Sequence, residues 1–151
     1  MMKSLSDEFT ISRAKREDTG EIRQLIYKES LHPFRLDWHN FLVVKKRGAI
    51  AACGQLRSHG NIDELGSLVV VPIYRREGIG TYLSKCLIEQ SNTSIYLSGK
   101  VTLESFYYSL GFRRVCWLDL PSEIKLEFSL YLIVSVLRNK PVIFMKREKL
   151  S

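Results

Sequence analysis

One short stretch, VVVPIYRREGIGT at residues 69–81, constrains the fold of this chain more than any other. Its apolar run ends at Pro72, which has no N–H for a sheet ladder, so a buried strand should stop there. Two arginines then lead to Gly78 and Gly80, and apolar residues recur at helical spacing beyond them. The stretch therefore predicts a strand, a glycine turn and the first turn of a helix.

Such a turn is suited to bind phosphate. The first turn of a helix carries unpaired backbone N–H groups and a partial positive charge. Glycine lets a ligand approach the backbone because it has no Cβ, and Arg75 and Arg76 add positive charge at the same point. Two common phosphate loops are absent: there is no GxxxxGK[ST] pattern, and Leu83 stands where a dinucleotide fingerprint has its third glycine.

Length and composition are those of an ordinary globular chain. We predict one domain over residues 1–151. Hydrophobic residues make up 45% of the chain and charged residues 26%, which suits one core without help from metal or disulfide. The opening sequence MMKSLSDEFT has no apolar segment, so we expect no secretory signal. The longest apolar stretch, Leu126–Leu137, is too short to span a bilayer.

The charge suggests an anionic ligand. A net charge of +7 suits a phosphorylated cofactor or a nucleic acid. The basic residues are scattered, apart from 45–47 and 146–149, which weakens the nucleic-acid alternative.

Cysteine and histidine give no sign of a disulfide framework or a metal site. Cys53, Cys86 and Cys116 are odd in number and form no CxxC pair, so we expect reduced, mostly buried thiols in a reducing compartment such as the cytoplasm. The three histidines have no metal-ligand spacing, and we predict no metal. His32 and His59 fall in turns that could border an acceptor pocket or be solvated loop positions.

Periodicity and turn signals predict a mixed sheet flanked by helices. The expected strands are 9–14, 41–46, 49–56, 63–71, 94–97, 112–118 and 141–146; the expected helices are one capped near Asp18, then 78–91, 101–110 and 121–137, with a loop at 31–38. The three strands between 41 and 71 should form an antiparallel meander. The fold class is α/β (α+β), with a mixed, mostly antiparallel sheet and an extra helix near the C-terminus.

Two linked motifs resemble the GCN5-related N-acetyltransferase (GNAT) family. The pattern Arg75-x-x-Gly78-x-Gly80, after an apolar strand ending Val-x-Pro, is similar to that family's acetyl-CoA signature. The segment FYYSLGF at 106–112 is similar to its FYxxxGF motif, and 33 residues separate the glycines of the two motifs. The likeness covers residues 8–118 and, less distinctly, the last strand.

The resemblance implies an N-acetyltransferase that uses acetyl-CoA as co-substrate and has no metal. In this family the strand before the loop splays from its neighbour and pairs with the pantetheine arm, here through the backbones of Leu68, Val69 and Val70. The implied pyrophosphate site consists of Arg75, Arg76, Glu77, Gly78, Ile79, Gly80 and Thr81.

The resemblance also suggests catalytic residues. The family often has a carboxylate eight residues before the proline, and Glu64 is there; it alternates with Gly66 and Leu68, so it should share their face. A base is useful because a lysine-like amine has a pKa of about 10.4. The backbone N–H of Val70 would hold the oxyanion. Tyr107 would protonate the leaving thiolate or hydrogen-bond its sulfur. The alternatives are a solvated strand-end glutamate for Glu64 and a structural role for Tyr107.

Two features depart from the family pattern. The family often has Asn seven residues before that tyrosine, where this chain has Lys100. The helix 121–137 is more apolar than one buried face requires, so it could also form a subunit interface, which makes a homodimer possible, or a wall of the acceptor site.

We therefore predict that the chain moves an acetyl group from acetyl-CoA to a primary amine by direct attack, with no membrane partner. Small amines, polyamines, protein N-termini and protein lysines all stay open as acceptors. The alternatives are a basic nucleic-acid-binding module, a transferase that acetylates RNA-borne amines, and a non-catalytic acyl-CoA sensor.

Overall fold

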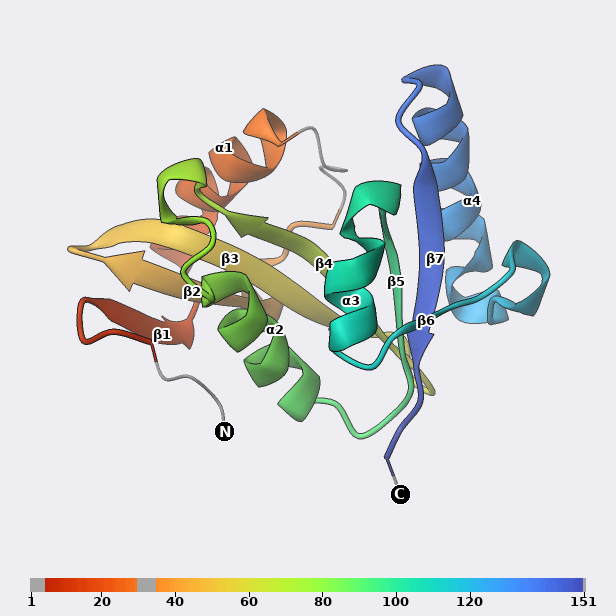
Figure 1. Ribbon diagram of the computed structural model, residues 1–151, viewed down its shortest axis with the longest axis horizontal. Helices are drawn as coiled ribbons and strands as arrows, with labels where there is room; N and C mark the ends of the chain where they lie inside the picture. Colours follow the sequence, from red (N-terminus) through yellow and green to blue (C-terminus); the bar gives the residue numbers. More distant parts are fainter. Residues whose placement is uncertain (1–4, 30–34, 151) are drawn as a thin grey trace. The chain divides into compact units, whose positions relative to one another are not determined.

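The computed structural model describes residues 5–29 and 35–150, and Figure 1 labels its main elements. The strands are β1 (Phe9–Arg13), β2 (Phe41–Lys46), β3 (Ala49–Ser58), β4 (Asp63–Val70), β5 (Ile95–Lys100), β6 (Arg113–Arg114) and β7 (Val142–Arg147). The α-helices are α1 (Thr19–Lys28), α2 (Ile79–Glu89), α3 (Glu104–Ser109) and α4 (Ser122–Leu137). Short 3-10 turns lie at Arg16–Asp18, Trp38–Asn40, Pro72–Tyr74, Val101–Leu103 and Trp117–Asp119.

The strands follow the order β1-β2-β3-β4-β5-β7-β6. β4 and β5 are parallel, whereas β1 with β2, β2 with β3, β5 with β7 and β6 with β7 are antiparallel. This confirms the predicted mixed, mostly antiparallel sheet with flanking helices and an extra helix, α4, near the C-terminus.

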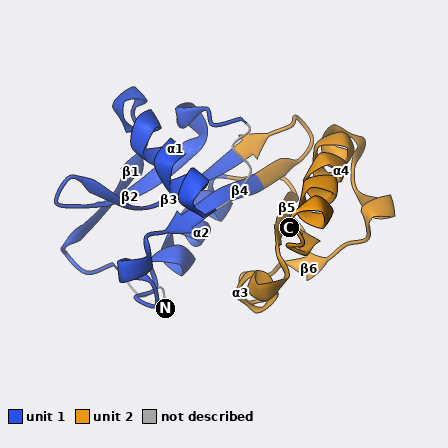
Figure 2. Ribbon diagram, turned by 90° about the horizontal axis from the view of Figure 1, so that it is seen from above, with its two compact units in different colours: residues 1–56, 65–90 blue, residues 57–64, 91–151 orange. Residues whose placement is uncertain are grey.

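The chain divides into two compact units, shown in different colours in Figure 2. The first comprises residues 1–56 and 65–90, and the second comprises residues 57–64 and 91–151. This division into units does not test the prediction of a single domain over residues 1–151, which stays a prediction.

In the first unit, helices cover both faces of the sheet. Neighbouring residues of a strand point to opposite faces. Cys53 of β3 is buried in a cluster with Ile22 and Ile26 of α1. At the next residue, Gly54, an added Cβ would lie only 2.9 Å from a methyl group of Leu87 in α2. The two helices therefore pack on opposite faces, which explains why β2 is buried almost throughout.

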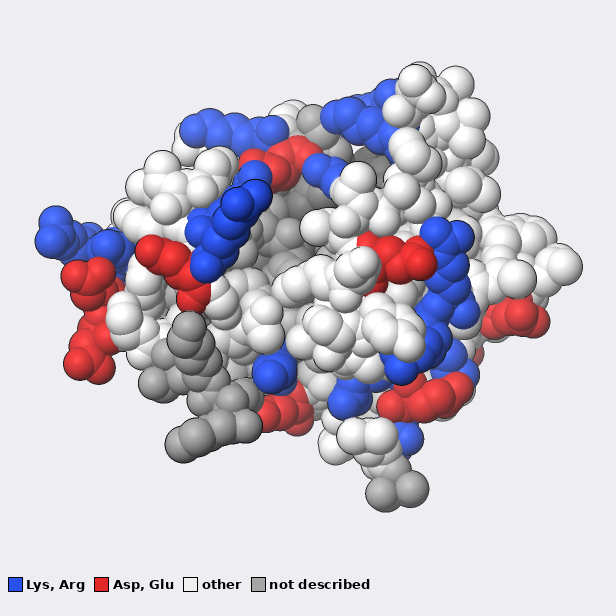
Figure 3. Space-filling model, viewed as in Figure 1, with Lys and Arg blue, Asp and Glu red and all other residues white. Residues whose placement is uncertain are grey.

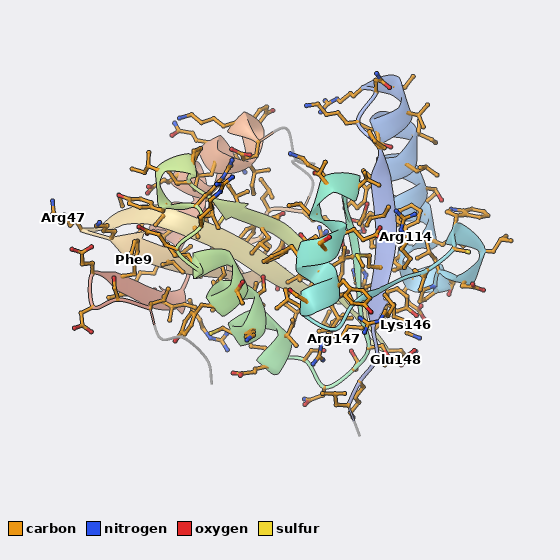
Figure 4. The ribbon with its side chains drawn as sticks, viewed as in Figure 1. Phe9, Arg47, Arg114, Lys146, Arg147 and Glu148 are labelled. Carbon is orange, nitrogen blue, oxygen red and sulfur yellow. The ribbon has the colours of Figure 1, made fainter. Side chains whose placement is uncertain are left out.

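The hairpin between β2 and β3 is closed by two residues with positive φ. Arg47 has a φ of 52° and Gly48 a φ of 81°. This conformation matches the twist of a two-residue hairpin, and it confirms the predicted turn. Arg47 lies at the far tip of this hairpin in Figure 4.

In the second unit, α4 packs against one face of β5 and β7. Its buried residues Ile124, Phe128 and Tyr131 form a cluster with Tyr96 of β5 and Phe144 of β7. The Phe128 and Phe144 rings stack with centroids 5.5 Å apart. The helix predicted at 121–137 is confirmed as Ser122–Leu137. Its buried positions recur at helical spacing.

Several predicted boundaries were wrong. The strand expected at 112–118 is reduced to Arg113–Arg114, because the chain turns into the 3-10 segment Trp117–Asp119. β5 continues to Lys100, three residues beyond the prediction, because β7 pairs with it along its length. The helix expected at 101–110 begins as a 3-10 turn before α3. The loop expected at 31–38 falls largely on residues 30–34, outside the described residues.

Two further predictions concern the burial of the cysteines and the absence of a membrane-spanning segment. Cys53 is buried and Cys86 partly buried, but Cys116 is exposed, so the prediction of buried thiols fails at that position. Across residues 5–29 and 35–150, no helix has the length and apolar character needed to cross a membrane.

Candidate active site

The strand that leads to the glycine loop contains one residue in a left-handed conformation. Ser67, inside β4, has a φ of 53°, in the region that serine rarely adopts. The neighbouring strand β3 holds this residue in place: the side-chain amide of Gln55 donates to its Oγ at 2.8 Å, and the Cys53 thiol donates to its carbonyl at 3.8 Å.

The left-handed Ser67 overturns one step of the sequence argument. Strict alternation would place Glu64, Gly66 and Leu68 on one face, but Ser67 interrupts it. A methyl group of Leu68 lies where a Cβ on Gly54 would be, beside the side chain of α2 residue Leu87. The Glu64 carboxylate instead contacts side chains of the second unit.

Backbone directions along the end of β4 follow from one hydrogen bond. The N–H of Val71 donates to the carbonyl of Ala51 in β3 at 2.8 Å. Because successive residues of a strand direct their backbone groups to opposite edges, Val70 directs its N–H and carbonyl away from β3. The Arg75 side chain donates to that carbonyl at 3.0 Å. The parallel ladder of β4 with β5 consists of two pairs, Asp63 with Ile95 and Glu64 with Tyr96.

The loop between β4 and α2 curls tightly. Arg76 has a φ of 66° and Gly78 a φ of 84°. Left-handed residues in such a loop turn successive backbone N–H groups toward a common concave side, which is a typical anion-binding arrangement. A Cβ added at Gly78 would meet no heavy atom within 4 Å, so its glycine is explained by the left-handed backbone and not by crowding.

Gly78 is the N-cap of α2 and supplies no side-chain cap. The helix's first internal hydrogen bond runs from Tyr82 N–H to the Gly78 carbonyl at 3.0 Å. The N–H groups of Ile79, Gly80 and Thr81 therefore have no intrahelical acceptor. With the helix dipole, they form a site suited to an anion.

The two arginines of the loop differ in their surroundings. The guanidinium of Arg75 forms an ion pair with Glu29 at 2.9 Å, in addition to its bond with the Val70 carbonyl. It therefore ties the loop to β4 and to the end of α1. Arg76 is exposed.

In the second unit, Glu64 belongs to a buried polar cluster. Its side chain is only 3% exposed. One carboxylate oxygen accepts from Arg57 Nη2 at 2.5 Å, and the other lies 2.9 Å from His59 Nε2. The alternative of a solvated strand-end glutamate is therefore wrong, because both oxygens have buried partners.

Helix α4 completes this cluster. Arg57 Nη2 donates to the Tyr131 hydroxyl at 3.3 Å, and Arg57 Nη1 lies 3.5 Å from Glu127 Oε1. Tyr131 in turn donates to Glu127. Burial alone would lower the pKa of the Arg57 guanidinium, but Glu64, Tyr131 and Glu127 outweigh it and raise that pKa. Arg57 is therefore the cation that balances two carboxylates.

The histidines can now be assigned. The His59 side chain is 9% exposed and bonded to Glu64, so the interpretation as a solvated loop histidine is wrong. His39 is exposed, with Nδ1 2.6 Å from Asp37. His32 lies outside the described residues.

Ligand atoms of His59, Glu64 and Glu127 lie within 4.8 Å of one another, which is a spacing that a metal ion could use. However, the Arg57 guanidinium already lies against both carboxylates. A metal ion would have to displace this buried positive charge, so the geometry favours a polar cluster built around Arg57 over a metal centre.

Tyr107 is buried in α3, with 7% of its surface exposed. Its ring lies over Gly99 of β5, where an added Cβ would be 3.1 Å from Tyr107 Cε2. Phe106 and Phe112 contact the ring edge to face. Burial raises the pKa of the Tyr107 hydroxyl to about 12. By contrast, the adjacent Tyr108 is 56% exposed, as expected for a packing or surface residue.

A surface hollow of about 650 Å³ lies along α1 and is lined by Gly20, Arg23, Gln24, Tyr27 and Lys28. None of the predicted catalytic or cofactor-binding residues lines it, so the chemistry is not assigned to it.

Basic residues near the C-terminus are interleaved with acidic ones (Figures 3 and 4). Arg114 pairs with Glu104, and Lys146 lies 2.7 Å from Glu148. Arg147 donates to the Leu110 carbonyl at 3.0 Å. This charge is largely compensated locally, which weakens the nucleic-acid alternative.

A family comparison decides the class of protein. The family described as acetyltransferase (GNAT) domain matches residues 37–114, just over half of the chain. This chain belongs to the GNAT acetyltransferase family. The match includes the β4 strand, the glycine loop, α2 and the Tyr107 motif, and it confirms the resemblance noted from the sequence. It also confirms the predicted enzyme class, acetyltransferase. A search of curated proteins finds no match.

Solved structures share the GNAT fold. N-acetylglutamate synthase from Neisseria gonorrhoeae, in complex with coenzyme A and N-acetyl-glutamate, has a TM-score of 0.79 and 15% identity; the match covers 98% of this chain and 37% of that one. This GNAT chain thus spans just over a third of that enzyme's length. A Mycobacterium tuberculosis protein in complex with CoA has a TM-score of 0.76 and 17% identity, over 93% and 99% of the two chains. A GNAT acetyltransferase from Staphylococcus aureus Mu50 has a TM-score of 0.70 and 22% identity, over 94% and 99%.

Sequence reasoning missed the partners of Glu64. Arg57 and His59 are two residues apart, so they could have been expected on one face of the hairpin. Glu127 and Tyr131 are four apart and share one face of a helix. Only the fold brings these two pairs together.

Proposed function

We propose that this GNAT protein transfers an acetyl group from acetyl-CoA to a primary amine, which attacks the thioester directly. The observation that carries the proposal is the β4–loop–α2 segment, where β4, with its left-handed Ser67, leads into a curled loop and a helix N-terminus without a side-chain cap. Acetyl-CoA supplies the thioester, and the residues of the chain bind it, orient it and move protons.

The loop 75–81 is the proposed pyrophosphate site. The N–H groups of Ile79, Gly80 and Thr81 point out of the first turn of α2, and the left-handed Arg76 and Gly78 shape the loop that precedes it. The Arg76 side chain can add a charge contact from the surface. Arg75 has a positioning role through Glu29 and the Val70 carbonyl.

The end of β4 is the proposed pantetheine site. The backbones of Leu68, Val69 and Val70 would pair with the amide groups of the arm. The Val70 N–H faces away from β3, so it can donate to the oxygen of the thioester as negative charge develops there. A fixed backbone donor needs no rearrangement for this task.

Glu64 is the proposed base, and the cluster geometry indicates that it acts through His59. Both oxygens of Glu64 already accept or share hydrogen bonds, so direct uptake of a proton would break one of them. Glu64 and Glu127 place two carboxyl groups beside the single cation Arg57, so the cluster can attract the ammonium of an acceptor and take up its proton through His59.

Tyr107 is proposed to hydrogen-bond the sulfur rather than to give up its proton fully. The pKa of its hydroxyl is about 12, whereas a coenzyme A thiol is similar to cysteine, with a pKa of about 8.5. Full transfer would be uphill by roughly 5 kcal/mol. A hydrogen bond to the developing thiolate has no such cost and still stabilises the leaving group.

Binding at the loop can be tested by calorimetry with acetyl-CoA. Gly80→Asp introduces bulk and negative charge into the first turn of α2 and should weaken binding at least tenfold. Gly20→Asp is the matched control, since Gly20 is also the second residue of a helix, α1, and a Cβ there meets nothing within 4 Å. Equal affinity of the Gly80→Asp variant and the parent would refute the assigned site.

The proton path can be tested by thiol release across a panel of a small amine, a polyamine and peptides with a free N-terminus or lysine. Glu64→Gln and His59→Gln should each lower kcat/KM by about 10²-fold at neutral pH, with partial recovery in alkali. Tyr107→Phe should show no alkaline recovery. His39→Gln and Tyr108→Phe, at exposed positions, are the controls.

The outcomes separate the roles. If kcat/KM falls in the Glu64→Gln variant but stays at the parent value in the His59→Gln variant, Glu64 acts directly. If Glu64→Gln and Tyr107→Phe keep the pH profile of the parent, neither residue acts in the reaction. Binding of acetyl-CoA without thiol release from any acceptor class would favour an acyl-CoA sensor.

A further inference from the structure

Helix α4 exposes an unusual amount of apolar side chain on its outer face. Five large apolar residues are between 53% and 81% exposed: Leu126, Leu130, Ile133, Val136 and Leu137. The edge of the molecule along α4 is correspondingly white in Figure 3. Together these side chains present roughly 600 Å² of apolar surface, the upper end of what a monomer usually exposes in one patch.

Four of these residues form a straight seam. Leu126, Leu130, Ile133 and Leu137 are separated by four, three and four residues, which is the alternating d and a spacing of a coiled coil. The opposite face of the helix is already used, because Ile124, Phe128 and Tyr131 are buried in the core of the second unit. The seam therefore needs a partner from outside this unit.

We propose that the partner is a second copy of this chain, whose α4 packs antiparallel against the first. The seam is self-complementary in that orientation. With a two-fold axis between Leu130 and Ile133, Leu126 faces Leu137 of the partner subunit, and Leu130 faces Ile133 of the partner subunit. Every apolar residue of the seam then meets another, as an isologous interface requires.

Charges at the two ends of the seam select the antiparallel orientation. Helix α4 ends at Leu137, and Lys140 follows within three residues. In this arrangement Glu123, at the start of α4, lies near Lys140 just past the end of the partner subunit's helix, at both ends of the interface. Both residues are exposed. A parallel pair would instead place Glu123 beside the partner's Glu123 and Lys140 beside the partner's Lys140. Antiparallel packing also opposes the two helix dipoles favourably.

The available area is sufficient for a dimer. Two copies of the five-residue apolar face, Val136 included, present about 1,200 Å² in total, above the roughly 1,000 Å² expected of a specific interface. A membrane surface is a poorer occupant, since an interfacial helix keeps a charged face in water, whereas the face of α4 opposite the seam is buried in protein.

Sedimentation equilibrium of the full chain tests the proposal. The parent should be a dimer at micromolar concentration. Leu126→Glu and Leu137→Glu each place two charges in the seam and should weaken dimerisation at least tenfold. Leu150→Glu is the matched control, because Leu150 is as exposed as Leu126, at 76%, but lies outside α4. Circular dichroism checks that each variant stays folded.

A charge swap tests the orientation. Glu123→Lys and Lys140→Glu should each weaken the dimer several-fold at low salt, and the double variant should restore it. A monomeric parent at 100 µM, a dimer insensitive to the seam variants, or a double variant weaker than both single ones would overturn the proposal. So would binding of the monomer to anionic phosphatidylserine vesicles that Leu126→Glu abolishes, since the seam would then have a lipid occupant.

Discussion

Replacing Arg57 by methionine should be one of the most destabilising single changes in this protein. The Arg57 and Glu64 side chains are 8% and 3% exposed, and Glu127 is 13% exposed. Arg57→Met removes the cation and leaves two largely buried carboxylates facing each other. Breaking a buried ion pair by removing one partner costs about 3–5 kcal/mol. With a urea slope of about 2 kcal/mol/M, the midpoint should fall by roughly 2 M.

Urea denaturation followed by circular dichroism measures this effect. Arg114→Met is the matched control, because Arg114 also pairs with a glutamate but is 60% exposed; its effect should stay below about 0.5 kcal/mol. Adding Glu127→Gln to Arg57→Met should recover part of the loss. An Arg57→Met variant within about 1 kcal/mol of the parent would refute the reasoning.

Three further predictions concern an acidic side chain, a tightly packed glycine and the cysteines. Burial alone would raise the pKa of Asp18, but hydrogen bonds from Lys45 and from a backbone N–H lower it. The contribution of Asp18 to the free energy of unfolding is therefore complete above about pH 4 and is lost as the pH falls below that value. Asp18→Asn should flatten this acid dependence of the urea midpoint. Gly54→Ala should destabilise the fold by about 1–3 kcal/mol in the same assay, because its Cβ would lie 2.9 Å from a leucine methyl group of α2. Alkylation at pH 8 should label exposed Cys116, whereas Cys53, buried and with its pKa raised to about 12, should react only after unfolding, as read by mass spectrometry.

The sequence alone determined the local features of the cofactor loop. The end of a strand at Pro72, the left-handed turn at Gly78 and the helix that follows are each specified within a few residues, by a missing N–H, a missing Cβ and an apolar period. The pairing of this loop with the FYYSLGF motif was enough to predict the family and the mixed sheet. The helix at 121–137 was predicted for the same reason, since its periodicity is local.

The tertiary structure alone decided what surrounds the catalytic candidates. No residue type predicts the left-handed conformation of Ser67, which is held by hydrogen bonds from Gln55 and Cys53 on the next strand. Likewise, His59 was expected to be solvated and Glu64 to follow simple alternation. Glu64 is buried against Arg57, which in turn bonds to a tyrosine 74 residues further along the chain, and the His59 ring is held by its bond to Glu64. A polar side chain can be buried only where partners satisfy it, and those partners are distant in sequence, so their contribution appears only once the chain has folded.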